Sequence, residues 1–148
     1  MREVEVHPAG PEDIEACFEI RRVVFVVEQG VSREEEFDGA DATCAHFVAR
    51  VDGQPAGTAR LVTTESRAKA QRVAVLERYR RLGLGRELMT ALEREARQRG
   101  LGSVVLHAQT AAIPFYEAIG YTAEGPVFEE AGIPHRVMTK PLVSAPAV

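Results

Sequence analysis

The sequence has only two cysteines, no CxxC pair and no long apolar run. Without a CxxC pair, nothing resembles a cysteine metal or redox site. Cys17 and Cys44 are therefore expected to be reduced, partly buried thiols, and no metal is expected. No apolar run reaches the ~18 residues of a membrane span, and the N-terminus has no apolar core of signal-peptide length. A cytoplasmic protein without membrane association is expected.

A surplus of basic charge is also absent. Eighteen basic and 22 acidic residues give a formal net charge of −4, whereas general nucleic-acid binding needs a basic face to neutralise phosphates. No nucleic-acid partner is expected, although a local basic pocket is still allowed. The 148 residues are 45% hydrophobic and 27% charged, which is typical of one soluble domain. That domain is expected over residues 1–142, with 143–148 as a disordered C-terminal tail.

Apolar periodicity predicts an α/β fold with a mixed sheet. Asp52-Gly53 predicts a tight hairpin turn, and Pro11 suits the first turn of a helix. Polar, acidic Gln29–Thr43 is either a solvated loop or a loop with a short helix. The predicted strands are Glu3–His7, Cys44–Val51, Gln54–Thr64, Lys69–Leu76, Ser103–Gln109, Pro126–Glu130 and His135–Leu142. The predicted helices are Pro11–Glu28, Glu87–Gly100 and Ala111–Gly120.

The stretch "RRLGLGR", Arg80–Arg86, joins a predicted strand to a predicted helix. Glycines at 83 and 85 let the backbone bend and leave N–H groups unshielded, and the helix adds the positive end of its dipole. These features predict an anion site, most naturally for phosphate. Arginine forks at 80, 81 and 86 match phosphate oxygens.

Two familiar phosphate motifs do not fit this loop. A nucleotide-hydrolysing P-loop needs GxxxxGK[ST], and the loop has no lysine. A dinucleotide fingerprint needs GxGxxG, and position 88 is leucine. A plain glycine turn with exposed arginines stays open as the alternative.

Two motifs together resemble the GNAT superfamily of acyl-CoA-dependent N-acetyltransferases. The first is [QR]-x-x-G-x-[GA], which reads Arg80-Arg81-Leu82-Gly83-Leu84-Gly85 here, and the second is "FYEAIGY", Phe115–Tyr121. Both occur in order and on the expected elements. The resemblance covers nearly the whole chain. It implies a mixed, mostly antiparallel sheet of about six to seven strands flanked by about four helices.

The resemblance also implies acetyl-CoA as the cofactor. The backbone of Val73 and Val75 would pair with its pantetheine arm like an added strand, and N–H groups of residues 81–86 would hold its pyrophosphate. Tyr116 would protonate the leaving thiolate, with a core aromatic as the alternative role. The residues implied for cofactor binding are Val73, Ala74, Val75, Arg80, Arg81, Leu82, Gly83, Leu84, Gly85, Arg86, Gln109, Ala112, Phe115 and Tyr116.

The acceptor side is similar to the bacterial ElaA-like branch, through "VFVVEQGVSREEEFDGADATCAHFVA" and "GIPHRVM". Many superfamily members use a glutamate on the fourth strand as base, but this strand has only Gln71 and Arg72 at that point. The catalytic candidates are therefore Tyr116, His135 and Glu28. The candidates for binding the acceptor are Glu28, Asp38, Asp41, His46 and His135, although His46 on a strand is more often structural.

The sequence thus predicts an N-acetyltransferase that moves an acetyl group from acetyl-CoA to a primary amine by direct attack in a ternary complex. A small amine, polyamine-like or amino-sugar-like, or an amine of a peptide is the expected acceptor, because acidic groups attract cations. A non-catalytic acyl-CoA-binding sensor or interaction module is the alternative. Members of this superfamily are often dimers, so a homodimer is a further expectation.

Overall fold

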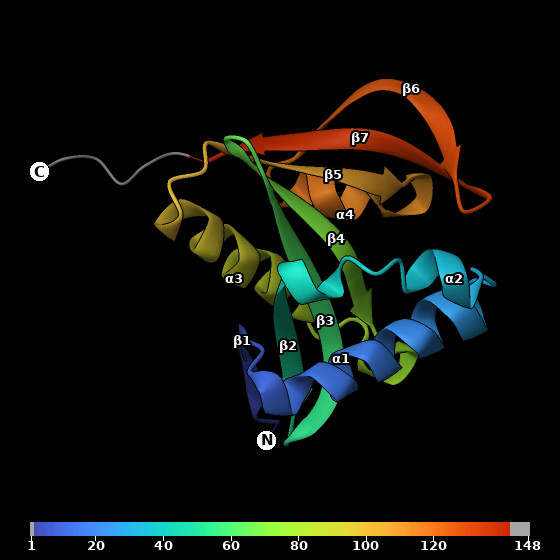
Figure 1. Ribbon diagram of the computed structural model, residues 1–148, viewed down its shortest axis with the longest axis vertical. Helices are drawn as coiled ribbons and strands as arrows, with labels where there is room; N and C mark the ends of the chain where they lie inside the picture. Colours follow the sequence, from blue (N-terminus) through green and yellow to red (C-terminus); the bar gives the residue numbers. More distant parts are fainter. Residues whose placement is uncertain (1, 143–148) are drawn as a thin grey trace, which may run out of the picture.

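A computed structural model describes residues 2–142, and the predicted tail at 143–148 lies outside the described residues. The described chain forms a seven-stranded sheet in the order β1-β2-β3-β4-β5-β7-β6 (Figure 1). All neighbouring strands are antiparallel except β4 and β5, which are parallel. This mostly antiparallel sheet with helices on it confirms the predicted fold class. The strands are β1 Val4–Pro8, β2 Ala45–Val51, β3 Gln54–Thr64, β4 Arg67–Val75, β5 Ser103–Gln109, β6 Thr122–Glu130 and β7 Ile133–Pro141.

Helices pack on both faces of the sheet. The helix α1 (Ile14–Arg21) follows a 3₁₀ turn at Pro11–Asp13 and continues as a π-helical segment, Arg22–Glu28, so the predicted helix Pro11–Glu28 is confirmed as one helical stretch. This stretch crosses one face of β2–β4, while α3 (Leu84–Gln98) packs on the other and α4 (Ile113–Ala118) packs against β5 and β6 (Figure 1). The acidic segment contains the short helix α2 (Arg33–Glu36).

The main core lies between α3 and the sheet. The predicted apolar stripe of α3 is buried throughout: Leu84, Leu88, Met89, Leu92 and Ala96 are each at most 2% exposed. These side chains pack with every second residue of β2, as the period-two geometry of a strand requires. Since α3 begins at Leu84, within the stretch Arg80–Arg86, core packing fixes where that stretch stands.

Most element boundaries agree with the prediction within two residues, but two elements begin three or four residues earlier than predicted. The helix α3 begins at Leu84 rather than Glu87, because Gly83 takes a left-handed conformation (φ 80°) that caps it. The strand β6 begins at Thr122 rather than Pro126, because Gly125-Pro126 falls at a bulge in an edge strand and does not break it. An edge strand tolerates proline since one side of it needs no N–H donor.

The strands β4 and β5 diverge halfway along their length. Parallel pairing runs from Arg67–Ser103 to Ala70–Leu106 and then stops, although the two strands continue to Val75 and Gln109. A bulge in β4 accompanies the divergence, where Arg72 has a positive φ of 58°. The β5-facing edge of Gln71–Val75 therefore has no strand beside it.

Truncating Leu88 tests the coupling between core and loop. Leu88→Ala is expected to lower the free energy of unfolding by about 2–5 kcal/mol, because it leaves a cavity in a close-packed core. Arg94→Ala, at an exposed position of the same helix, is the control and should leave stability nearly unchanged. Chemical denaturation measures both, and equal stabilities would contradict the assigned packing of α3.

Candidate active site

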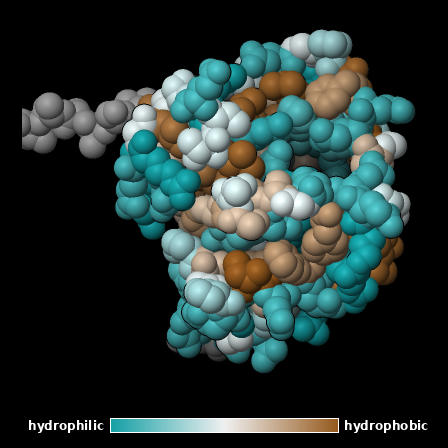
Figure 2. Space-filling model, viewed as in Figure 1, coloured by the Kyte–Doolittle hydropathy of each residue, from teal (hydrophilic) through white to brown (hydrophobic). Residues whose placement is uncertain are grey.

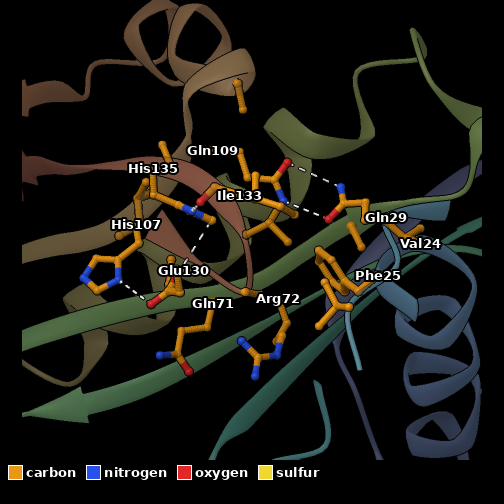
Figure 3. Close-up of a pocket in the computed structure, with 18 of the residues that line it drawn as sticks. Val24, Phe25, Gln29, Gln71, Arg72, His107, Gln109, Glu130, Ile133 and His135 are labelled. Carbon is orange, nitrogen blue, oxygen red and sulfur yellow. Dashed lines mark hydrogen bonds and ion pairs between the residues drawn. The ribbon is translucent and has the colours of Figure 1, made fainter. Parts of the chain in front are cut away.

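The divergence of β4 and β5 opens a cavity of about 570 Å³, visible as a hollow rimmed largely by hydrophilic residues in Figure 2. Its walls come from β4, β5, the end of the π-helical segment, the acidic loop and the β6–β7 hairpin (Figure 3). The end of β4 contributes the apolar residues Val73, Ala74 and Val75, whereas the hairpin contributes the polar side chains of Glu130 and His135. The cavity therefore has two chemically different halves.

Some of the residues predicted to bind the cofactor line this cavity. They are Val73, Ala74, Val75, Arg80, Gln109, Ala112 and Tyr116. The remaining ones, Arg81–Arg86 and Phe115, are not among its described lining residues. The side chain of Leu84 is buried in the core, so only its backbone is available to a ligand.

The arginine–glycine loop has the backbone geometry of an anion cradle. Arg81 and Gly83 both have positive φ angles, 70° and 80°, and the first turn of α3 leaves N–H groups without partners inside the helix. Gly85 is needed for a different reason: a Cβ there would lie 3.0 Å from Cζ of Phe115. The loop therefore needs Gly83 for its bend and Gly85 for its contact with α4.

Arg80 and Glu28, predicted separately, are joined to each other. The Arg80 guanidinium donates from Nε to the carbonyl oxygen of Val75 (2.9 Å) and from Nη2 to Glu28 Oε2 (2.8 Å). Glu28 is not among the described residues that line the cavity. The structure thus places Glu28 as a partner that orients Arg80 at the edge of β4.

Gln109 and Gln29 form a reciprocal amide pair. Nε2 of Gln109 donates to Oε1 of Gln29 at 2.9 Å, and the reverse bond measures 3.4 Å (Figure 3). Gln29 follows the π-helical segment and Gln109 ends β5, so the pair connects the two walls of the cavity. Gln29 belongs to the stretch that resembles the ElaA-like branch, but it was not predicted as a site residue.

Tyr116 lies on α4 and lines the cavity while being only 8% exposed. Burial raises the pKa of its hydroxyl far above the usual range. Its ring packs edge-on against Phe115 and Tyr121. The raised pKa means that the Tyr116 hydroxyl keeps its proton at neutral pH.

The acidic loop is a solvated surface only in part, since Glu34 and Glu35 are exposed whereas other acids of the loop pair with arginines, which partly corrects the sequence interpretation. Glu36 is 3% exposed, and Asp41 accepts hydrogen bonds from the fully buried Arg21 (2.7 Å) and Arg60 (2.9 Å). Arg60 also binds Asp38. The prediction failed for the paired acids because the arginines that bind them lie far away along the chain.

Neighbouring arginines change the pKa values of these carboxyl groups. Hydrogen bonds from Arg60 hold the pKa of Asp38 well below its usual range. Burial opposes ionisation of Asp41, but the bonds from Arg21 and Arg60 outweigh it and lower the pKa. For Glu36, burial prevails over its arginine partners and raises the pKa.

The predicted acceptor residues divide into two groups. Asp38 and His135 line the cavity, whereas Asp41 and His46 are not among its described lining residues. Nε2 of His46 lies 3.0 Å from the carbonyl oxygen of Asp41, and its ring packs edge-on against Phe18. Asp41 and His46 thus support the loop from beneath, and the structure does not bring them to a ligand in this cavity.

Two further cavity residues were missed in the sequence. Glu130 stands before the β6–β7 turn and His107 in the middle of β5. Nδ1 of His107 lies 3.1 Å from Glu130 Oε1, and Nε2 of His135 lies 3.8 Å from Glu130 Oε2 (Figure 3). Only the hairpin brings Glu130 beside both rings, so its position depended on strand register. The one available signal was its place five residues before His135.

No group of three or more His, Cys, Asp or Glu side chains within residues 2–142 is arranged to hold a metal ion. Across the same range, no helix has the length and apolar character needed to cross a membrane.

Comparison with known proteins assigns most of the chain to one family model. An acetyltransferase (GNAT) domain model matches residues 18–142. A candidate acetyltransferase of Bacillus subtilis is 41% identical over 132 residues, which cover 87% of this chain and 90% of that protein. The residues matched by the family model include the arginine–glycine loop and the described lining of the cavity.

Solved structures show the same fold. A candidate N-acetyltransferase from Lactobacillus plantarum has a TM-score of 0.86 and 33% identity, covering 96% of this chain and 99% of that one. ElaA of Escherichia coli has a TM-score of 0.80 and 26% identity, covering 95% of this chain and 99% of that one. The predicted resemblance to the ElaA-like branch is confirmed.

Asp41 offers a test of the charge network beneath the cavity. Asp41→Asn is expected to lower the free energy of unfolding at pH 7 by about 1.5–3 kcal/mol, because Arg21 and Arg60 lose the carboxylate that they share and keep only Glu36 and Asp38 as charged partners. Glu19→Gln, which breaks the exposed pair with Arg22, is the control and should have little effect. Denaturant titration compares the two variants.

The same network sets the acid sensitivity of the fold. Asp38 and Asp41 have folded pKa values below their unfolded value of about 3.9. Their contribution to stability is therefore complete above that value and lost as the pH falls below it. Asp41→Asn should flatten this acid limb, and an unchanged limb would contradict the assignment.

Proposed function

This chain belongs to the GNAT acetyltransferase family, and from that premise we propose that it transfers an acetyl group from acetyl-CoA to a primary amine by direct attack in a ternary complex. The observation that carries the proposal is the divergence of β4 from β5 beside the N-terminus of α3. The divergence leaves an open edge on β4, and the first turn of α3 has N–H groups without partners inside the helix. Both features lie next to one cavity. An extended, phosphate-bearing ligand fits both features.

The residues of the cofactor half fit coenzyme A. Gly83 and Gly85 leave the loop backbone unshielded, so N–H groups of residues 81–86 would hold the pyrophosphate, with Arg80, Arg81 and Arg86 beside it. The open edge at Val73, Ala74 and Val75 would pair with the pantetheine arm. Gln109, Ala112 and Phe115 complete the proposed contacts. When bound, acetyl-CoA supplies the activated acetyl group.

Arg80 and the Gln29–Gln109 pair must change their hydrogen bonds when coenzyme A occupies this half of the cavity. The Arg80 Nε–H now donates to the carbonyl of Val75, which is an acceptor that an added strand would use. Gln109 now bonds only Gln29 among the described residues. We infer that Arg80 turns from Val75 toward the phosphates while Glu28 holds its other nitrogen.

The catalytic part of the proposal assigns one role to each side of the cavity. Tyr116 donates a hydrogen bond to the sulfur of the leaving group. His135 removes a proton from the acceptor, which must be neutral to attack. Of the other acceptor candidates, Asp38 contributes charge at the wall, while Glu28, Asp41 and His46 act through the residues they hold. A homodimer and a cytoplasmic location stay predictions of the sequence.

Cofactor binding can be tested at Gly83 with a matched control. Gly83→Val is expected to weaken acetyl-CoA binding at least about tenfold, because a β-branched residue is strained at positive φ and covers the loop N–H groups. Gly100→Val introduces the same strain at the other end of α3, where φ is 74° and the space is open. Calorimetric titration should show reduced affinity only in Gly83→Val.

Two outcomes would count against the proposal. If the wild-type protein does not bind acetyl-CoA in the titration, the cofactor assignment is contradicted. Tight binding without release of free thiol for any amine would instead favour the sensor function.

Tyr116→Phe tests the leaving-group role. Removing the hydroxyl is expected to lower kcat by about a hundredfold, with the KM for acetyl-CoA nearly unchanged, because the lost interaction forms only as the thiolate leaves. Tyr79→Phe, outside the lining of the cavity, is the control. Steady-state release of thiol measures both, and wild-type kcat in Tyr116→Phe would leave Tyr116 as a packing residue.

A further inference from the structure

Glu130 is a cavity-lining carboxylate that is not in an ion pair with any described arginine or lysine. Glu36 and Asp38, in the same lining, are bound by arginines. Glu35 accepts a hydrogen bond from Ser32 at the start of α2. The only charged or titratable partners of Glu130 among residues 2–142 are the two imidazoles of His107 and His135. Glu130 is thus the carboxylate best placed to offer charge to a ligand.

Hydrogen bonding determines which ring nitrogen of His135 carries the proton. Nδ1 lies 2.6 Å from the carbonyl oxygen of Ile133, and a carbonyl oxygen can only accept. Nδ1 must therefore be the N–H, which leaves the lone pair of the neutral ring on Nε2. That lone pair is 3.8 Å from the carboxylate oxygen of Glu130. Two acceptors therefore face one another at a separation too long for a hydrogen bond.

His107 and Phe128 fix this arrangement from behind. Nδ1 of His107 donates to the other oxygen of Glu130 at 3.1 Å. Phe128 contacts both imidazoles, edge-on to His107 and stacked on His135. His107 therefore orients the Glu130 carboxylate, which faces His135. The gap between them is bounded by two acceptor atoms, Glu130 Oε2 and His135 Nε2.

We propose that Glu130 Oε2 and His135 Nε2 form the subsite that binds the primary ammonium group of the acceptor, with His107 as the residue that positions Glu130. The proposal rests on the proposed acetyltransferase function and extends it to the acceptor. An ammonium group has three N–H donors and no acceptor, so it satisfies both facing atoms at once. An alcohol has a single donor, and a carboxylate ligand would repel Glu130.

The subsite also accounts for the proton. One N–H bond of the ammonium breaks as Nε2 of His135 takes its proton, which leaves a neutral amine and an imidazolium. Glu130, 3.8 Å away, stabilises the new positive charge. The released amine keeps its own lone pair for attack on the acetyl group. His135 thereby takes the place of the acid that β4 lacks.

Ring nitrogen spectra test the subsite without turnover. Long-range ¹H–¹⁵N spectra of the full chain should show His135 protonated at Nδ1 and bare at Nε2. Spermidine, glucosamine and lysinamide serve as amine probes, and at least one should shift the Nε2 signal. Glu130→Gln should abolish that shift. Glu129→Gln removes the same charge from the exposed neighbouring position and should preserve it.

Kinetics provides the second readout. With the amine that turns over best, Glu130→Gln should raise the acceptor KM about tenfold to a hundredfold, as expected for a lost charge-assisted bond. His135→Asn should lower kcat about a hundredfold or more. Glu129→Gln should match the wild type in both constants, and the Kd for acetyl-CoA should be unchanged in every variant.

The outcomes separate this inference from the proposed function. A His135 ring protonated at Nε2, no shift with any probe, or equal behaviour of Glu130→Gln and Glu129→Gln would overturn the subsite. A wild-type protein that shifts its His135 signal with amines but neither binds acetyl-CoA nor releases thiol would retain the subsite and overturn the transfer reaction. Loss of the shift in Glu130→Gln alone supports the subsite.

Discussion

The parallel pairing of β4 with β5 ends after four residue pairs, and the site depends on that ending. Two parallel strands would normally continue side by side and satisfy each other's backbone groups. Here Arg72 adopts a positive φ in a bulge, and its side chain reaches Glu36 and Asp38 in the acidic loop. The strain of that bulge is therefore maintained by ion pairs from outside the sheet. The cavity exists because the edge of β4 is turned away from β5.

The acidic loop stays beside the cavity because two buried arginines need its carboxylates as partners. Arg21 and Arg60 are almost fully buried, and a buried guanidinium without a partner would be strongly destabilising. Among residues 2–142, only the carboxylates of the acidic loop form ion pairs with these two arginines. Such a network is weak support for overall stability, but it leaves the loop few alternative positions. The polar wall is thus positioned by charge, whereas the loop at α3 is positioned by apolar packing.

Local patterns in the sequence were sufficient for most of the fold. The helical stretch Pro11–Glu28 and the strand Gln54–Thr64 have the predicted bounds, because proline, Asp-Gly and regular periodicity act over short distances. The cofactor loop was also predictable, since it depends on glycines at fixed spacing. The burial of Asp41 was not, because its partner Arg60 is 19 residues away and on another element. Glu130 was missed for the same reason: its neighbours follow from the register of β5, β6 and β7.

The arginine–glycine loop was predictable and Glu130 was not, because the two halves of the cavity would recognise a ligand through different chemical groups. In the proposed assignment, the cofactor half would use backbone N–H and C=O groups, so the sequence reveals it only through the glycines that expose them. The acceptor half would use side chains on three strands, and exchanging one residue there would alter recognition without altering the fold. A single scaffold can therefore keep one cofactor while its acceptor changes. In the proposed site the acid–base groups lie at the β6–β7 hairpin, whereas β4 has Gln71 and a bulged Arg72 and offers no acid at that point.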